Sequence, residues 1–199
     1  MKNKVVGIGL SKTGTTTLRE VFRVLGFEYV GFDGELTNAV LDGETRSALE
    51  VFDQYQAAAN FPWALMYREI DAAFSSTRFV LTVRRDSQTW LKSLHSQAKK
   101  RPNSAYRERI YGCRNLRGHE DRLLKYYENH NQQVRDYFAR RPKALLELCW
   151  ETGAGWHELC EFLEVPIPMA PFPHANRSPL IKKPVFRRML STFGKRKSA

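Results

Sequence analysis

Residues 4–17 read KVVGIGLSKTGTTT, a short apolar run followed at once by a loop of small and hydroxyl-bearing residues around one lysine. An apolar run of this length, stopped by a loop, is typical of a buried β-strand. A helix is expected after it, because apolar residues then recur at helical spacing, at Leu18, Val21, Phe22 and Leu25. The stretch therefore predicts a strand, a loop and a helix in direct succession.

The loop has the composition of an anion-binding site. Unpaired N–H groups at a helix N-terminus and the positive end of the helix dipole attract negative charge. Lys12 adds a point charge, and Gly14 lets the backbone approach a ligand closely. The alternative is a glycine- and threonine-capped helix with an exposed lysine. In a nucleotide-triphosphatase P-loop the lysine directly follows the second glycine, whereas here Thr15 follows Gly14.

The rest of the chain alternates between predicted strands and helices. Further strands are expected at 28–32, 79–83 and 144–149, while residues 56–59 are ambiguous between strand and helix. Helices are expected at 62–74, around 90–94, at 117–140 and at 154–163, and residues 35–52 are expected to be mostly helical with polar breaks. The proline-rich segment 166–184 is expected to be extended, and 185–193 to form a last basic helix. This alternation predicts an α/β fold of three layers, with a central parallel sheet flanked by helices.

A second basic site is expected where the strand at 79–83 ends. Arg84 and Arg85 follow that strand, and ligands bind at the carboxyl ends of the strands in open α/β sheets. A magnesium-dependent phosphotransferase would be expected to carry an acid there instead. Arg85 and Ser93 could hold one phosphate, through a planar guanidinium and a hydroxyl. Asp86 could cap the following helix.

Charge is concentrated at the end of the chain. The 199 residues carry a formal charge of +11, and eight basic residues with no acid lie between Arg177 and Ala199. We expect one domain over residues 1–175 and a basic extension over 176–199. The extension could contact nucleic acid, an acidic surface or a polyanionic substrate, or be a solvated terminus. Motifs that read bases are missing from the sequence, which argues against specific nucleic-acid binding.

The sequence lacks the signals of membrane and secreted proteins. No apolar run approaches the roughly 20 residues that span a bilayer, and the N-terminal apolar stretch is too short for a secretory signal. The three cysteines, Cys113, Cys149 and Cys160, are far apart, which fits a reducing compartment and gives no zinc-binding spacing. These features predict a cytoplasmic protein without a bound metal.

Several motifs in order along the chain resemble the P-loop-like sulfotransferases, which use 3′-phosphoadenosine-5′-phosphosulfate (PAPS). The family's first signature is matched by Lys12-Thr13-Gly14-Thr15-Thr16 between a strand and a helix. Its second is an Arg-Asp pair after a strand with a serine eight residues after the arginine, as at Arg85 and Ser93. Further segments resemble the small bacterial-type members, at 61–71, 79–84, 127–142, 155–163 and 172–176.

The resemblance implies an enzyme that transfers a sulfuryl group from PAPS to a hydroxyl or amine of a small molecule or glycan. It implies that the 5′-phosphosulfate is held by Lys12, Thr13, Gly14, Thr15, Thr16 and Thr17, and the 3′-phosphate by Arg85 and Ser93. Lys12 would also stabilise charge on the bridging oxygen, without a metal ion. The rival interpretations are a P-loop kinase of a small metabolite and a module that binds nucleic acid or another polyanion.

The expected general base is the point where the sequence departs from the family. Related proteins often have an acid shortly before the proline equivalent to Pro62, but here residues 56–61 are QAAANF. The amides Gln56 and Asn60 cannot take a proton. The remaining candidates for the base are Asp33, Glu35 and Asp53, of which Asp33 is preferred, although each could be a loop acid or helix cap.

Other polar and aromatic residues have less specific interpretations. His130 is expected to be structural rather than to face a ligand, and His174 could position the adenosine side of a cleft. Trp90 and Trp156 are expected in the core, and Trp63 could line an acceptor pocket.

Overall fold

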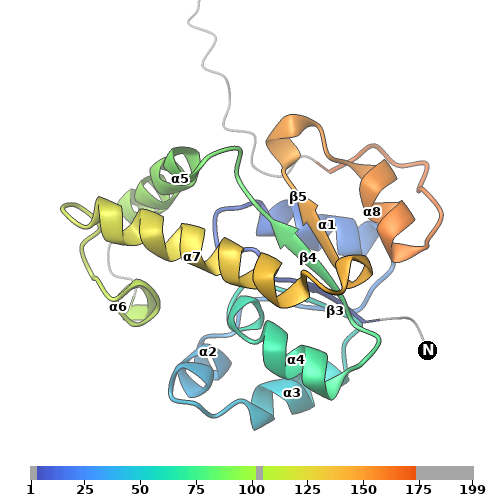
Figure 1. Ribbon diagram of the computed structural model, residues 1–199, viewed down its shortest axis with the longest axis horizontal. Coiled ribbons are helices and arrows are strands. Elements are labelled where there is room, and N and C mark those ends of the chain that lie inside the picture. The colour runs from blue at the N-terminus through green and yellow to red at the C-terminus, as the bar shows by residue number, and fades with distance from the viewer. Residues whose placement is uncertain (1–3, 102–104, 174–199) are drawn as a thin grey trace, which may run out of the picture.

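Five parallel strands form the centre of the computed structural model, which describes residues 4–101 and 105–173 (Figure 1). Their order across the sheet is β2-β3-β1-β4-β5. The strands are β1 (Val5–Gly7), β2 (Tyr29–Val30), β3 (Ala57–Ala59), β4 (Arg78–Thr82) and β5 (Leu145–Leu148). Because all neighbouring pairs are parallel, the loops that follow the strands gather at one edge of the sheet.

Helices connect the strands and cover both faces of the sheet. The α-helices are α1 (Thr15–Val24), α2 (Gly34–Leu41), α3 (Arg46–Asp53), α4 (Tyr67–Ala73), α5 (Ser87–Lys100), α6 (Ala105–Tyr111), α7 (Glu120–Phe138) and α8 (Trp156–Leu163). Short 3₁₀ helices are η1 (Trp63–Leu65), η2 (Pro142–Ala144) and η3 (Trp150–Thr152). In the part of the chain that the structure describes, no helix is both long and apolar enough to cross a membrane.

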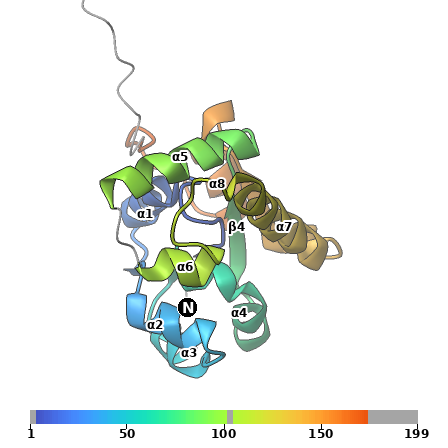
Figure 2. The ribbon, with the colours of Figure 1, turned by 90° about the vertical axis from the view of Figure 1, so that its left-hand side faces the viewer.

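Alternate residues of the strands face opposite layers, as the period of two in a β-strand requires. Val6 and Phe79 lie in a core with residues of α3, α4 and α7. Val5 and Val80 lie in the other core, with residues of α1 and α8. Figure 2 shows α1 and α7 on opposite sides of β4. The expected three-layer α/β fold is therefore confirmed.

A third apolar cluster supports the loops at the carboxyl edge of the sheet. It joins Leu10 and Phe61, which follow β1 and β3, to α5, α6 and the first half of α7. Trp90 of α5 is fully buried there, as expected, and stacks on Tyr127 of α7 with ring centroids 4.6 Å apart and planes at 14°. Apolar packing thus fixes the loops from behind, which leaves their polar atoms at the edge.

The stretch 35–52, expected to be mostly helical with polar breaks, forms two helices in the structure, α2 and α3. The break falls at Gly43, whose φ of +93° lies in the left-handed region that favours glycine. The ambiguous segment 56–59 contains β3, whose three alanines are fully buried between two strands. Residues 166–173 form neither helix nor strand, in agreement with the expected extended segment. The predictions for residues 174–199 lie outside the described residues.

A charged cluster joins α4 to the end of α7. Arg141 donates two hydrogen bonds to the carboxylate of Asp71, at 2.9 and 2.6 Å, and the Tyr137 hydroxyl donates a third at 2.7 Å. These hydrogen bonds, those from Arg141 above all, hold the pKa of Asp71 below its ordinary value of 3.8. A carboxylate with a lowered folded-state pKa stabilises the fold above its unfolded pKa.

We predict that Asp71→Asn makes unfolding less sensitive to acid. In the wild-type protein, the stability that Asp71 contributes is present above pH 3.8 and is lost as the pH falls through the lowered folded-state pKa. The measurement is the free energy of unfolding in urea for both proteins between about pH 6 and pH 3. The difference between them should shrink on acidification, and a difference that stays constant across this range contradicts the account.

Candidate functional site

The loop after β1 packs tightly against the end of β4. Thr13 is fully buried, and its hydroxyl donates to the carbonyl of Leu10 at 2.7 Å while contacting the Thr82 hydroxyl at 2.7 Å. A Cβ on Gly9 would lie 2.3 Å from the carbonyl oxygen of Thr82, so only glycine fits there. Thr13 therefore shapes the loop from within. Its hydroxyl is used by the protein, which differs from the expected role of this side chain as a ligand donor.

Two further contacts hold the loop from the side of the helices. Trp90 of α5 donates from Nε1 to the carbonyl of Ser11 at 2.9 Å. His130 of α7 lies with Nε2 2.8 Å from the carbonyl of Ile8, and burial lowers the pKa of its imidazole. A neutral ring can donate from Nε2 to this carbonyl. His130 is therefore a structural residue, as expected.

The N-terminus of α1 is left open to a ligand. Lys12 and Gly14 both adopt left-handed backbone conformations, with φ of 78° and 103°. Gly14 is the N-cap of α1, so no side chain caps this helix, and its first turn contains no acid. The hydroxyls of Thr15 and Thr16 make no hydrogen bond in the described part of the chain. The orphan N–H groups of a first turn and two hydroxyls are donors suited to an anion.

Lys12 lies in a strongly positive environment. It is half-buried, and burial lowers the pKa of its ammonium group first, with Arg84, Lys100 and Arg101 lowering it further. The side chains that act on Lys12 are therefore all cationic. Like charges held together at a partly buried position are costly unless an anion offsets them. Such a cluster of cations around a half-buried lysine fits an anion-binding site.

Two buried donors near the loop lack acceptors. Trp150, in η3 after β5, covers Gly14 so closely that a Cβ there would lie 2.4 Å from its Nε1. Trp150 Nε1 and Arg84 Nε are both buried and make no hydrogen bond in the described structure. Buried donors are normally satisfied, so these two fit the binding of a negatively charged or acceptor-rich group. No sequence pattern pairs Trp150 with Gly14, so this residue was not predicted.

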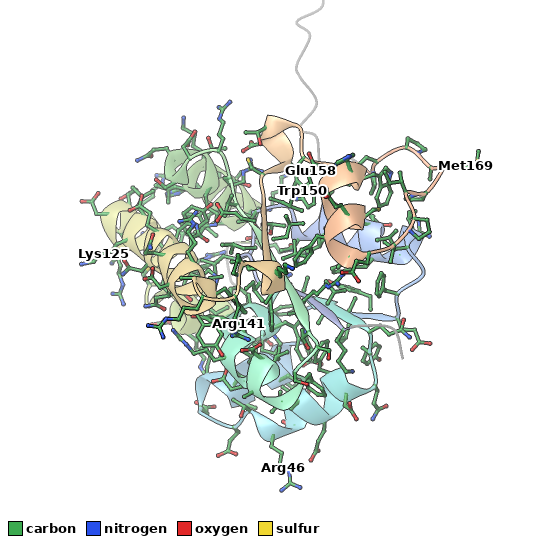
Figure 3. The ribbon with its side chains drawn as sticks, turned by 45° about the vertical axis from the view of Figure 1, so that its right-hand side comes forward. Arg46, Lys125, Arg141, Trp150, Glu158 and Met169 are labelled. Carbon is green, nitrogen blue, oxygen red and sulfur yellow. The ribbon has the colours of Figure 1, made fainter. Side chains whose placement is uncertain are left out.

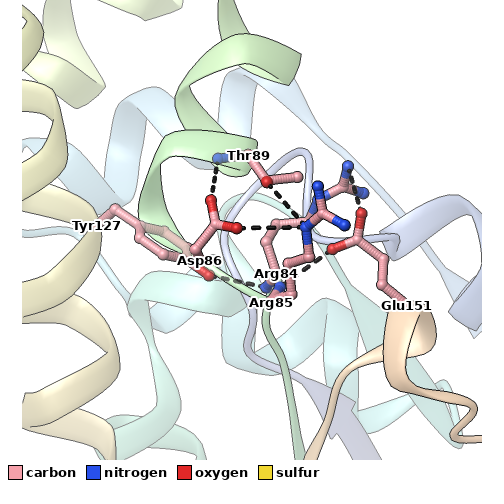
Figure 4. A network of polar contacts seen from close by, with 6 residues as sticks. All are labelled: Arg84, Arg85, Asp86, Thr89, Tyr127 and Glu151. Carbon is pink, nitrogen blue, oxygen red and sulfur yellow. Dashed lines mark hydrogen bonds and ion pairs between the residues drawn. The ribbon is translucent and has the colours of Figure 1, made fainter.

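The arginine pair after β4 is divided between two environments (Figure 4). Arg84 is three-quarters buried and forms an ion pair with Glu151 at 3.1 Å, and its backbone N–H donates to the Tyr127 hydroxyl at 2.9 Å. Arg85 is exposed at the rim of the site, beside Asp86 at 3.3 Å. Its Nε also lies 3.4 Å from the Thr89 hydroxyl. A guanidinium held in this way keeps other N–H groups for a ligand.

Arg85 directly precedes the cap of α5, and Ser93 lies within that helix. Asp86 caps α5 by accepting from the backbone N–H of Thr89, as expected. Ser93 is half-buried, one turn beyond the Trp90 that holds the loop at Ser11. β4, which leads into α5, pairs directly with β1, so the two predicted anion sites follow neighbouring strands. The assignment of a 3′-phosphate to Arg85 and Ser93 stays a prediction.

A polar cleft of about 590 Å³ opens beside the arginine pair, where the ends of β4 and β5 meet α7. Arg84 and Arg85 line one side of it, and Arg135 and Glu147 line the other as an ion pair at 2.8 Å. Asn131 lines it too, and its Oδ1 is buried without a partner. The cleft is large enough for part of a nucleotide-sized ligand.

The three candidate bases lie in different places. Asp33 follows β2 and caps α2, where its Oδ1 accepts from the N–H of Leu36 at 2.9 Å. Glu35 is exposed in the first turn of α2. Asp53 lies 3.8 Å from Lys4, which precedes β1, so it belongs to the amino edge of the sheet, opposite the loop. The geometry removes Asp53 as a candidate, and the catalytic role of Asp33 stays a prediction.

The structure also locates two tryptophans whose places were predicted from the sequence, Trp63 and Trp156. Trp63, which was expected to line an acceptor pocket, is fully buried and donates to the carbonyl of Gly31. It is therefore a core residue, because η1 turns its ring under the sheet. Trp156 of α8 is partly buried against the core shared with α1. His174 lies outside the described residues.

The cysteines and possible metal ligands add no second site. Cys113, Cys149 and Cys160 are free thiols, and two of them are buried. In the described ranges, no three His, Cys, Asp or Glu side chains come together as a metal site.

Comparisons with known proteins place this chain in a family. A family model described as a sulfotransferase domain matches residues 4–180. The chain is 27% identical over 212 residues to a protein named Ava biosynthesis cluster protein M from Aspergillus versicolor, covering 86% of this chain and 80% of that protein. A solved gluconokinase from Sinorhizobium meliloti 1021 matches 71% of this chain and 98% of its own, with 10% identity and a TM-score of 0.36. A likeness at that score supports no functional conclusion.

The family match includes every strand of the sheet, the loop around Lys12 and the arginine pair after β4. It confirms the resemblance that the ordered motifs suggested. The chain belongs to the sulfotransferase domain family.

Proposed function

We propose that this protein transfers a sulfuryl group from PAPS to a small-molecule or glycan acceptor. The observation that carries the proposal is the open N-terminus of α1 beside Lys12, whose pKa is lowered by burial and, among the described residues, by the cations Arg84, Lys100 and Arg101. Membership of the sulfotransferase domain family supports it independently. PAPS supplies an activated sulfuryl group with a phosphate as the leaving group. A cytoplasmic location, expected from the cysteines, stays a prediction.

The residues present fit such a donor molecule. The backbone N–H groups at the start of α1, the hydroxyls of Thr15 and Thr16, and Lys12 would bind the 5′-phosphosulfate. Lys12 would stabilise the negative charge that grows on the bridging oxygen, and Arg85 with Ser93 would bind the 3′-phosphate. The backbone donors of this helix start are fixed before binding, so they require little reorganisation during the reaction. The buried donors of Arg84 and Trp150 would gain acceptors in the complex.

The nucleotide preference separates this proposal from a kinase. The product nucleotide 3′,5′-ADP should raise the melting temperature in the presence of EDTA, because it binds only the folded protein. At a free 3′,5′-ADP concentration of about 100 times its Kd, binding would stabilise the fold by about 2.7 kcal/mol. Stabilisation by ATP with Mg²⁺, without any effect of 3′,5′-ADP, would contradict the proposal and favour a kinase. Binding of duplex DNA that falls steeply with salt and survives Lys12→Ala would favour the polyanion-binding alternative.

We predict that Lys12→Ala lowers kcat for sulfuryl transfer by about 10²–10³-fold, the usual loss when one donor to a developing oxyanion is removed. The measurement is single-turnover transfer of ³⁵S from labelled PAPS. Lys125→Ala is the matched control, because this exposed lysine of α7 lies at the periphery, away from Trp150 (Figure 3). Near wild-type turnover by a folded Lys12→Ala variant removes this lysine from the mechanism.

We predict that Arg85→Ala weakens binding of 3′,5′-ADP about 10–100-fold, as expected for a lost hydrogen bond between charged groups. Arg85 is exposed, so the melting temperature without ligand should change little. Calorimetric titration measures the affinity. Arg46→Ala is the control, because the exposed Arg46 at the start of α3 lies away from Trp150 (Figure 3). An unchanged affinity would assign the 3′-phosphate to other residues, as would an equal loss in 5′-AMP binding.

A further inference from the structure

Asn60 lies beside the anion-binding loop, at the position that follows β3. Its Oδ1 accepts from the Ser11 hydroxyl at 2.8 Å and from the backbone N–H of Phe61 at 3.0 Å. Its backbone has a φ of 78°, in the left-handed region that asparagine tolerates better than most residues. Ser11 directly precedes Lys12, so this amide contacts the same loop that carries the central lysine.

The hydrogen bonds fix the orientation of the Asn60 amide. The backbone N–H of Phe61 can only donate, so the atom that faces it must be the carbonyl oxygen. The Nδ2 group is left on the other side, and it makes no hydrogen bond within the described residues. Asn60 therefore presents two N–H donors where a carboxylate would present a proton acceptor. An amide at this position cannot take a proton from an acceptor hydroxyl.

The charged side chains that act on Lys12 are cationic. Every charged side chain that lowers the pKa of Lys12 is a cation, namely Arg84, Lys100 and Arg101. The Asp33 carboxylate is engaged as a helix cap, and the Glu151 carboxylate is paired with Arg84. A field of this sign favours the ionised form of a bound hydroxyl and disfavours a protonated amine. The surroundings can therefore do by electrostatics what a general base does by proton transfer.

We propose that Asn60 selects acceptors with an acidic hydroxyl of the phenol or enol type, which bind as oxyanions beside Lys12. The proposal rests on the sulfotransferase function proposed above. The acceptor loses its proton to water before transfer, and Asn60 Nδ2–H donates to the resulting oxygen anion. That oxygen forms the new bond to sulfur, the bond between sulfur and the phosphate oxygen breaks, and its electron pair leaves on that oxygen. On this proposal Asp33 acts as a helix cap.

The ionisation of a bound phenol tests the proposal without turnover. In the complex with 3′,5′-ADP, the pKa of 4-nitrophenol, followed by the absorbance of its anion, should fall by about one unit or more, a tenfold change in the ionisation constant. Asn60→Asp should reverse this shift, because it replaces Nδ2 by a charged oxygen but keeps the acceptor for Phe61 and Ser11. Asn115→Asp is the matched control, since Asn115 is exposed and its Oδ1 also accepts a backbone N–H, from Arg117.

Turnover adds a second readout. The wild-type protein should transfer to ring-substituted phenols, with a pH profile whose plateau follows the pKa of each phenol, and at least tenfold more slowly to benzyl alcohols of the same shape. Asn60→Asp should lower the rate with phenols and raise that with benzyl alcohols, because a positioned base contributes about 10²–10⁴-fold.

Several results would overturn the proposal. These are equal rates with phenols and benzyl alcohols, an unshifted pKa of bound 4-nitrophenol, or no phenol binding at millimolar concentration. If 3′,5′-ADP still binds in those cases, the sulfotransferase function stands and only the acceptor class fails. If 3′,5′-ADP does not bind the wild-type protein, the proposed function fails as well.

Discussion

The buried contact between Thr13 and Thr82 is the constraint on which the site depends. It joins the loop after β1 to the last residue of β4, and the missing side chain of Gly9 allows the two backbones to approach. Because the loop cannot move away from β4, the N-terminus of α1 and the arginine pair share one edge of the sheet. The apolar cluster around Trp90 then holds α5 against the same loop. The packing of the loop against β4 and α5 therefore brings the N-terminus of α1 and the arginine pair to one edge of the sheet.

The positive environment of Lys12 has consequences for both substrates. Cations gathered at a half-buried position oppose one another, so the site is organised for an anion before any ligand arrives. The same field acts on the acceptor. A hydroxyl that ionises there needs no carboxylate nearby, and Asn60, with its oxygen held by Phe61, offers donors instead of a proton acceptor. The anion-binding loop and the acceptor position therefore follow from one electrostatic design.

Features that depend on a few neighbouring residues could be predicted from the sequence. The strand at 79–83, the loop around Lys12 and the Asp86 cap were correctly placed because apolar periodicity, glycine and capping residues act over a few positions. Breaks in the helical stretch 35–52 were expected, but their position at Gly43 was not predicted, since one glycine in a helical pattern does not require a break. The burial of the Thr13 hydroxyl and the cover of Trp150 over Gly14 depend on residues 69 and 136 positions apart in the chain. Contacts of this kind arise from packing across the sheet, which no local pattern reports.

A crystal structure with bound 3′,5′-ADP would locate both phosphates of the nucleotide. We expect the 5′-phosphate on the backbone N–H groups at the start of α1, within reach of Lys12, and the 3′-phosphate on the guanidinium of Arg85. We also expect acceptors for the buried donors of Arg84 and Trp150. A nucleotide bound elsewhere, or a loop that turns its N–H groups away from the 5′-phosphate, would contradict the account.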